Sequence, residues 1–213
     1  MTMKRTILLL IIVLTVTAVS LTACQEEEKK VIETMTSGFM TGYTNHDGLM
    51  YKLKDDFGNL YNLNEKRGFF TPDSTYRLLA SIALKDNGSA SILQLVGIPS
   101  ENAPEDSVLE DSVKVKDPLK VYTAYIGGGY LNITLGIKVE KEHTIHRLRY
   151  SHKEDSLSTT FLLYHNAYGD GQVYTKNAYV SIPLTKYALT QNDTVSIIYN
   201  GYDGDSIMTL VYR

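Results

Sequence analysis

The sequence predicts an all-β protein with two β domains. Short runs of alternating apolar and polar residues recur along the chain, and clusters of Gly, Asp and Asn separate them. The composition agrees with this fold class, because the 213 residues include 16 Tyr and no Trp, and Tyr is favoured on half-buried pleated surfaces. Helix patterns are weak throughout, and one turn between Ser107 and Val115 is the most that we expect.

The N-terminal domain is expected over residues 36–110. Two hairpin turns are expected, at Asp55-Asp56-Phe57-Gly58-Asn59 and around Asn87-Gly88, where Asn-Gly suits positive φ. A closed barrel of the OB type has about five short strands, and its closure removes the exposed edges of an open sheet. We therefore expect a small OB-like barrel, with strands at 38–44, 49–54, 60–63, 76–84 and 89–98.

The C-terminal domain is expected over residues 111–213. Its clearest strand signal is at 130–137, where apolar residues occupy every second position. About six or seven short strands separated by Gly-Asp turns indicate an antiparallel β-sandwich. Between the domains, residues 99–118 hold three of the five prolines and many acids, which predicts a linker or long crossover with a boundary near residue 110. Further strands are expected at 144–151, 159–166, 178–184, 194–200 and 206–212.

Residues 1–23 have the pattern of a lipoprotein signal peptide. Lys4 and Arg5 precede an apolar run over 6–20, which is shorter than the ~20 residues that a membrane-spanning helix needs. The segment ends in Leu21-Thr22-Ala23-Cys24, and Cys24 is the one cysteine of the chain. This ending resembles the bacterial lipobox, which implies cleavage before Cys24, acylation of Cys24 and membrane lipid as a partner. The alternative is an ordinary secretory signal followed by a chance cysteine.

An acidic tether is expected over residues 24–35. Its acidic run, Glu26 to Glu28, is similar to the export signals that send some lipoproteins to the outer face of the outer membrane. We therefore expect a surface-exposed outer-membrane lipoprotein, with a periplasm-facing anchor as the alternative. The net charge of −3 argues against a nucleic-acid partner, because such proteins usually carry a basic patch.

Three segments of the C-terminal half resemble the core of the NigD-like lipoproteins in order and spacing. They are Gly-Tyr-Leu-Asn-Ile at 129–133, Phe-Leu-Leu-Tyr-His-Asn-Ala-Tyr-Gly-Asp at 161–170, and Tyr-Val-Ser-Ile at 179–182. The resemblance implies an N-terminal OB-like barrel and a C-terminal β-sandwich. It implies no catalytic residue, because the family has no established activity. Its name derives from a bacteriocin-associated locus, which suggests immunity as one function.

The sequence shows no catalytic constellation and predicts no cofactor. Of the five histidines, His143 and His146 are three apart, and in a strand they would point to opposite faces, so we expect no histidine metal site. His165 is expected to make a structural hydrogen bond to a loop carboxylate or to the backbone. Two acidic turns leave calcium binding open, although such turns are common in β proteins. One turn contains Asp55, Asp56 and Asn59, and the other contains Asp203 and Asp205. The remaining two histidines of the chain are His46 and His152.

Two further patterns bear on function. Gly127-Gly128-Gly129 opens a strand rather than a helix, which predicts a bulge or a close backbone approach instead of a phosphate site. Several tyrosines could supply aromatic platforms for a glycan, although most are expected to pack in the core. The tyrosines considered are Tyr122, Tyr125, Tyr164, Tyr168 and Tyr174.

These observations predict a non-enzymatic, lipid-anchored envelope protein. Its partner is expected to be another envelope protein or an extracellular ligand, for which a glycan is one class. Two alternatives stay open. The first is protection against a bacteriocin or toxin, and the second is an enzyme whose site is assembled from distant loops.

Overall fold

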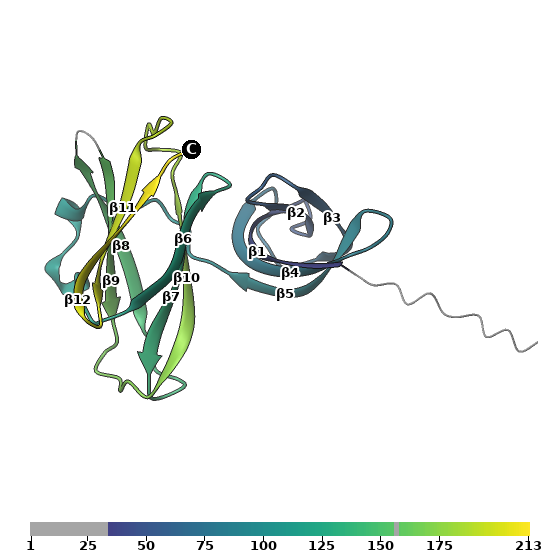
Figure 1. Ribbon diagram of the computed structural model, residues 1–213. Helices are drawn as coiled ribbons and strands as arrows, with labels where there is room; N and C mark the ends of the chain where they lie inside the picture. The colour runs from purple at the N-terminus through teal and green to yellow at the C-terminus, as the bar shows by residue number, and fades with distance from the viewer. Residues whose placement is uncertain (1–33, 156–157) are drawn as a thin grey trace, which may run out of the picture. The chain divides into compact units, whose positions relative to one another are not determined.

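The computed structural model describes residues 34–155 and 158–213, so the predicted signal peptide and Cys24 lie outside the described residues. The fold is all-β, as predicted: a five-stranded closed barrel precedes a sandwich of a three-stranded and a four-stranded sheet (Figure 1). In the part of the chain that is described, no helix has the length and apolar character needed to cross a membrane.

The barrel follows the predicted hairpins closely. β1 pairs with both β2 and β4, and β3 pairs in parallel with β5 at two positions, which closes the barrel. Alternate residues of each strand point inward, as the period of a strand requires, and Met40, Leu53, Leu78 and Ile82 belong to its core. The strands are β1 (Thr34–Thr44), β2 (Met50–Asp55), β3 (Leu60–Arg67), β4 (Thr75–Leu84) and β5 (Ser89–Gly97).

The sandwich consists of the sheets β10-β7-β6 and β12-β11-β9-β8. Its core is lined by the apolar residues of β7 that alternate from Leu131 to Val139. All strand pairs in it are antiparallel except β9 and β11, which are parallel because the chain forms β10 in the other sheet between them. The strands are β6 (Lys120–Gly127), β7 (Tyr130–Val139), β8 (Arg147–Asp155), β9 (Ser158–Asn166), β10 (Tyr174–Pro183), β11 (Thr194–Gly201) and β12 (Gly204–Val211).

Strand β6 is absent from the strands expected from the sequence. Its register against β7 shifts between Val121 and Thr123, where the strand has a bulge. A bulge inserts one extra residue and breaks the period of two. The alternation by which the other strands are recognised is therefore lost in this segment.

Residues 98–119 run along the sandwich. Ala103 is fully buried in the sandwich core, and isolated bridges join Glu105 to His152 and Lys116 to His165. The two short 3-10 turns, η1 (Asp106–Val108) and η2 (Asp111–Val113), lie where one helical turn is expected. This segment makes backbone hydrogen bonds to strands β8 and β9. Its contacts with the sandwich therefore begin before residue 110, where the sequence places the domain boundary.

A buried ion pair joins the barrel to the sandwich within the compact unit formed by residues 34–213. Arg77 of β4 and Asp56, which follows β2, have side chains that are 0% and 3% exposed. The guanidinium of Arg77 donates to Asp56 Oδ2 at 2.7 Å, to Asn132 Oδ1 at 2.8 Å and to Ser181 Oγ at 2.8 Å. Since Asn132 and Ser181 belong to β7 and β10, one barrel side chain is bonded to two sandwich strands.

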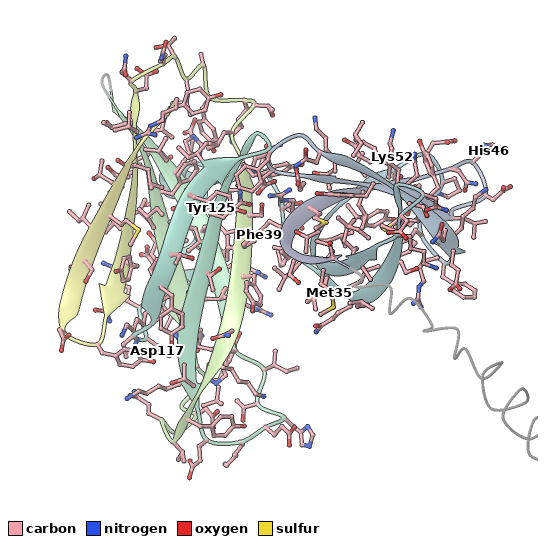
Figure 2. All side chains as sticks on the ribbon, turned by 45° about the vertical axis from the view of Figure 1, so that its right-hand side comes forward. Met35, Phe39, His46, Lys52, Asp117 and Tyr125 are labelled. Atoms are coloured by element: carbon pink, nitrogen blue, oxygen red, sulfur yellow. The ribbon has the colours of Figure 1, made fainter. Side chains whose placement is uncertain are left out.

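Asp56 gathers further donors from the sandwich. Its Oδ2 accepts from the Tyr125 hydroxyl at 2.7 Å and from Asn132 Nδ2 at 2.9 Å. Its Oδ1 lies 2.6 Å from Arg77 Nη2 without hydrogen-bond geometry, so charge attraction holds it. The ring of Phe39 on β1 packs edge-on against Tyr125 with centroids 5.9 Å apart, and Figure 2 labels both side chains.

The glycine triplet makes this joint possible. Gly128 and Gly129 have φ of +61° and +87° and form the two-residue turn between β6 and β7. A Cβ at Gly127 would come within 2.9 Å of Asp56 Cβ, and one at Gly128 would collide with Asp56 Oδ1. The predicted close backbone approach is therefore confirmed, and the neighbour that approaches is the ion-paired carboxylate.

Candidate functional site: a tyrosine and lysine groove

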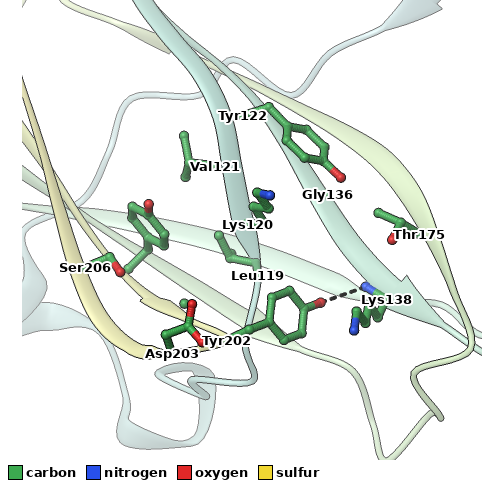
Figure 3. A pocket seen from close by; sticks show the side chains of 12 residues that line it. Leu119, Lys120, Val121, Tyr122, Gly136, Lys138, Thr175, Tyr202, Asp203 and Ser206 are labelled. Carbon is green, nitrogen blue, oxygen red and sulfur yellow. Dashed lines mark hydrogen bonds between the residues drawn. The ribbon is translucent and has the colours of Figure 1, made fainter.

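A groove of about 480 Å³ opens where strand β6 begins (Figure 3). It combines the start of β6 and the outer face of β7 with the end of the β11–β12 hairpin. Its volume lies within the range of about 300–1,000 Å³ that is usual for small-molecule sites. The groove is lined by Leu119, Lys120, Val121, Tyr122, Gly136, Lys138, Thr175, Tyr199, Gly201, Tyr202, Asp203 and Ser206.

Tyr122 is placed in the groove by the glycine opposite it. A Cβ at Gly136 would come within 2.7 Å of the Tyr122 ring, so the absence of a side chain at Gly136 lets the ring lie against β7. Tyr122 is 43% exposed, and within the described residues its hydroxyl makes no hydrogen bond. The ring therefore presents both an apolar face and a free hydroxyl to a ligand.

Tyr202 forms the opposite wall and is anchored to β7. Pairing between β6 and β7 starts at Lys120, the first residue of β6, which is opposite Gly136. The backbone N–H of Lys138 therefore lies beyond the part of β7 that is paired with β6. The Tyr202 hydroxyl accepts a hydrogen bond from this N–H at 3.0 Å. Burial raises the pKa of Tyr202, the bond from Lys138 opposes that rise, and the nearby Tyr122 adds to it. Tyr202 thus stays neutral and fixed in place.

Two lysines give the groove its charge. Lys120 Nζ lies 5.6 Å from the centre of the Tyr122 ring, and Lys138 Nζ lies 4.9 Å from the centre of the Tyr202 ring. Both distances allow cation–π attraction. In the described part of the chain neither lysine has a carboxylate within ion-pair distance, and Asp203 is the one acid of the lining.

A chain of buried polar groups lies next to the groove. His146 Nδ1 is 2.9 Å from His165 Nε2, and His146 Nε2 is 3.1 Å from Asp170 Oδ2. His165 Nδ1 is 3.2 Å from the carbonyl oxygen of Pro118. A small cavity of about 70 Å³ beside this chain is lined by His165 and Asp170, and it shares Lys138 and Tyr202 with the groove.

The partners of this chain determine where its protons are. The carbonyl of Pro118 only accepts, so His165 Nδ1 carries a hydrogen and the Nε2 of a neutral His165 accepts from His146. The carboxylate of Asp170 also only accepts, so the two rings together carry three N–H hydrogens and share one positive charge. Burial and the charge of His146 lower the pKa of His165, which agrees with a neutral ring there.

Asp170 balances the charge of the histidine pair. Burial by itself would raise the pKa of Asp170, but hydrogen bonds from His146 and from the backbone N–H groups of Glu140 and Lys141 lower it to about 2. The side chains of His146 and Asp170 are 3% and 0% exposed. The chain therefore fastens the β7–β8 connection to the sandwich, and the side chains of His146 and Asp170 are closed to a substrate.

The other residues singled out in the sequence have structural surroundings. His165 bonds to the backbone, as predicted, whereas its link to His146 was not expected. His152 Nδ1 lies 2.9 Å from the carbonyl of Ala103, and the exposed His46 lies 3.2 Å from Asp73. Over the described ranges, no group of three His, Cys, Asp or Glu residues is arranged to hold a metal ion.

The carboxylates of the first acidic turn are engaged in hydrogen bonds and an ion pair. Asp55 accepts from the N–H groups of Phe57 and Asn59, from Asn59 Nδ2 and from the Tyr61 hydroxyl. Asp56 is bound to Arg77. Asp205 is paired with Asn200 in the β11–β12 hairpin, and Asp203 lines the groove.

The five tyrosines considered for ligand binding divide into three groups. Tyr125 and Tyr164 donate to Asp56 and Asp106, so their hydroxyls are occupied. Tyr168 and Tyr174 are exposed outside the groove, and Tyr122 lies within it. Sequence reasoning did not single out Tyr199 and Tyr202. A tyrosine inside the turn Gly201-Tyr202-Asp203-Gly204 was a signal that could have identified Tyr202.

Comparison with known proteins identifies the family. Residues 101–212 match the NigD-like C-terminal beta sandwich domain. A NigD-like immunity protein from Bacteroides caccae has a similar structure, with 24% identity, a TM-score of 0.67, and coverage of 82% of this chain and 91% of its own. A search of curated proteins found no match.

Two further solved structures share the fold. A protein from Parabacteroides distasonis, provisionally named as toxin-related, has 22% identity and a TM-score of 0.67, covering 84% of this chain and 94% of its own. A protein from Bacteroides fragilis, provisionally named a lipoprotein, has 11% identity and a TM-score of 0.55, covering 84% and 96%. Because the NigD-like domain spans more than half of its residues, this chain belongs to the NigD-like family.

Proposed function

We propose that this protein is a non-enzymatic, lipid-anchored protein of the outer membrane that binds a glycan in the tyrosine and lysine groove. The observation that carries the proposal is the groove itself, in which Tyr122 and Tyr202 form two walls around about 480 Å³. The lipobox at Cys24 and the acidic run after it support the anchor and its orientation toward the cell surface.

The chemistry of the walls favours a sugar. The C–H faces of a sugar ring pack on tyrosine rings, while sugar hydroxyls need polar partners beside them. The groove offers both, because Tyr122 is half exposed and Lys120, Thr175 and Ser206 lie in the same lining. The walls are also fixed before a ligand arrives, since Tyr202 is bonded to β7 and Tyr122 lies against Gly136. Preformed walls lower the entropy cost of binding.

The surroundings of the buried histidines support a binding role over catalysis. A general base needs an accessible lone pair, but the ring nitrogens of His146 and His165 are all engaged, with each other, with Asp170 and with the carbonyl of Pro118. Asp56 and Asp106 are likewise engaged, the first by Arg77 and the second by Ser151 and Tyr164. A measured hydrolase or transferase activity would contradict this part of the proposal.

The test uses the mature chain from residue 24 with Cys24→Ser, so that acylation does not interfere. Its binding to an array of oligosaccharides is compared with that of Tyr122→Ala and Tyr202→Ala variants. We expect at least one oligosaccharide class to bind, with about a tenfold or larger loss in each variant. Tyr168→Ala is the matched control, because Tyr168 is exposed and lies outside the groove. Unchanged binding in both groove variants would place the ligand elsewhere.

The orientation of the anchor is tested separately by protease treatment of intact cells. A surface-exposed protein is digested, and replacement of Glu26, Glu27 and Glu28 by Ala is expected to protect it, because the acidic export signal is lost. Protection of the wild-type protein would indicate that it faces the periplasm.

Immunity is the second candidate function. It is favoured by the similar fold of the NigD-like immunity protein from Bacteroides caccae and by the toxin-related name of the Parabacteroides distasonis protein. In this case the partner is a protein toxin. Deletion of the gene is expected to sensitise cells to a bacteriocin, and unchanged sensitivity across a bacteriocin panel would remove this candidate.

A further inference from the structure

We infer that the groove selects an anionic sugar, with Lys120 and Lys138 binding its charged group. This inference rests on the proposed function, because it names the class of glycan that the same groove takes. Three features of the groove support it: the common face of the lysines, the absence of an acid partner, and the contrast with the charge of the whole chain.

The lysines lie on one face of the sheet. Lys120 is directly opposite Gly136 in the β6–β7 pairing, and Lys138 is two residues further along β7. Opposed residues of paired strands share a face, and so do residues two apart in one strand. Thr175 on β10 is opposite Lys138 and extends the same face. Both ammonium groups therefore belong to the side of the sheet that carries the wall of Tyr122.

The charges of these lysines are not used within the described protein. Two other cations do have acid partners: Arg77 is paired with Asp56, and Lys114 lies 3.6 Å from Asp106. Lys120 and Lys138 have aromatic rings as their neighbours instead. A tyrosine face attracts a cation but does not neutralise it. An anion of the ligand would thus find two ammonium groups beside the surface on which its ring stacks.

The groove also differs in sign from the protein as a whole. Its lining contains two lysines and one aspartate, whereas the full chain has a net charge of −3. A local positive site on an acidic protein favours an anionic ligand at that site over the rest of the surface. Because the lysines are at least partly open to solvent, the preference is expected to weaken as salt is added.

The experiment uses probes that differ in charge and little else. Trigalacturonate is compared with its methyl ester, which keeps the sugar ring and loses the negative charge, and a sulfated galactose oligosaccharide distinguishes sulfate from carboxylate. Binding is measured by titration calorimetry at low and high salt, with the same mature chain carrying Cys24→Ser. We expect the affinity for an anionic probe to be at least about tenfold higher than the affinity for the ester. This difference in affinity should become smaller at high salt.

Two variants and one control assign the effect to the lysines. Lys120→Gln and Lys138→Gln are expected to reduce the affinity for the anionic probe about tenfold each and the affinity for the ester by much less, because glutamine keeps a polar side chain and loses the charge. Lys52→Gln is the matched control, because Lys52 also lies over a tyrosine ring, 4.9 Å from the centre of Tyr43, but on the barrel. We expect no change in binding for the control.

The outcomes separate this inference from the function on which it rests. Equal binding of the acid and the ester, lost in Tyr122→Ala, would overturn the anionic preference and retain the groove as a glycan site. Equal losses in Lys120→Gln, Lys138→Gln and Lys52→Gln would also overturn it, because the effect would then be one of overall charge. No binding of any saccharide would remove the proposed function, and this inference with it.

Discussion

Two clusters of this protein combine tyrosines with cations, and they have opposite properties. At the joint between barrel and sandwich, Arg77 and Tyr125 both bond to Asp56, which is almost fully enclosed. In the groove, Lys138 and Tyr122 have no carboxylate enclosed with them. The same residue types therefore build a structural joint where an acid is buried among them, and a groove open to solvent where none is.

The choice of cation follows the same division. Arginine presents a planar fork of donors, which suits the simultaneous bonds of Arg77 to Asp56, Asn132 and Ser181. Lysine carries a mobile point charge that stays hydrated at the surface. A joint needs fixed directions, whereas in the proposed binding groove a mobile charge could adjust to a ligand.

The largest expected effect is on the joint. Asp56→Ala should lower the free energy of unfolding by about 3–5 kcal/mol, because Arg77 would remain buried without its counter-charge. Urea unfolding followed by circular dichroism measures it. Asp203→Ala, in the groove, is the control and should change stability by no more than about 0.5 kcal/mol. Similar values for the two variants would remove the distinction between joint and groove.

Two neighbouring glycines separate backbone strain from crowding at the joint. Gly129→Ala should cost about 1–2 kcal/mol, since its φ is positive but no atom lies near its Cβ position. Gly128→Ala should cost at least about 1 kcal/mol more, because its Cβ would also collide with Asp56. Thermal and urea unfolding of both variants test this. Equal losses would mean that the turn does not confine Asp56.

Removal of one hydroxyl compares the two clusters most directly. Tyr125→Phe should destabilise the fold by about 1 kcal/mol, because Asp56 would lose a hydrogen bond. Burial is the main cause that raises the pKa of Tyr125, and the hydrogen bond to Asp56 raises it further. The hydroxyl is therefore protonated at neutral pH and is the donor of this bond. Tyr122→Phe should leave stability unchanged, since within the described residues its hydroxyl makes no hydrogen bond. The two unfolding curves should therefore differ, and coincident curves would contradict the comparison.

A further expected effect concerns acid stability. The pKa of Asp170 is lowered from 3.8 to about 2, so its contribution is complete above pH 3.8 and is lost as the pH falls toward 2. The pKa of His165 is lowered below 6.5, so stability should already begin to fall as the pH drops below 6.5. Unfolding midpoints measured from pH 7 to pH 2 test both steps.

A matched pair of variants assigns the step at lower pH. Asp170→Asn should flatten the pH dependence below 3.8, because no carboxylate would be left to protonate at that position. Asp73→Asn, which alters an exposed pair with His46, should preserve the slope. A slope that persists in Asp170→Asn would show that another carboxylate causes it.

Local pattern was enough to predict much of the fold. The alternation in β7 and the Asn87-Gly88 turn predict correct elements, because both depend on residues close in sequence. The bulge of β6 hides a strand from the same reasoning, since its alternation is broken at Val121 to Thr123. Tyr122 was identified as a candidate from its residue type, but its place opposite Tyr202 depends on where β6 begins.

The sequence by itself determined the all-β class, the order of barrel and sandwich, and the positions of most turns, because period and turn chemistry are local. Only the tertiary structure decided which polar groups are enclosed and which stay free. Arg77 meets Asn132 and Ser181 across separations of 55 and 104 residues, and no local pattern encodes such a meeting. A tyrosine and a cation that are buried with a carboxylate partner form a joint. Exposed ones without such a partner remain accessible from solvent.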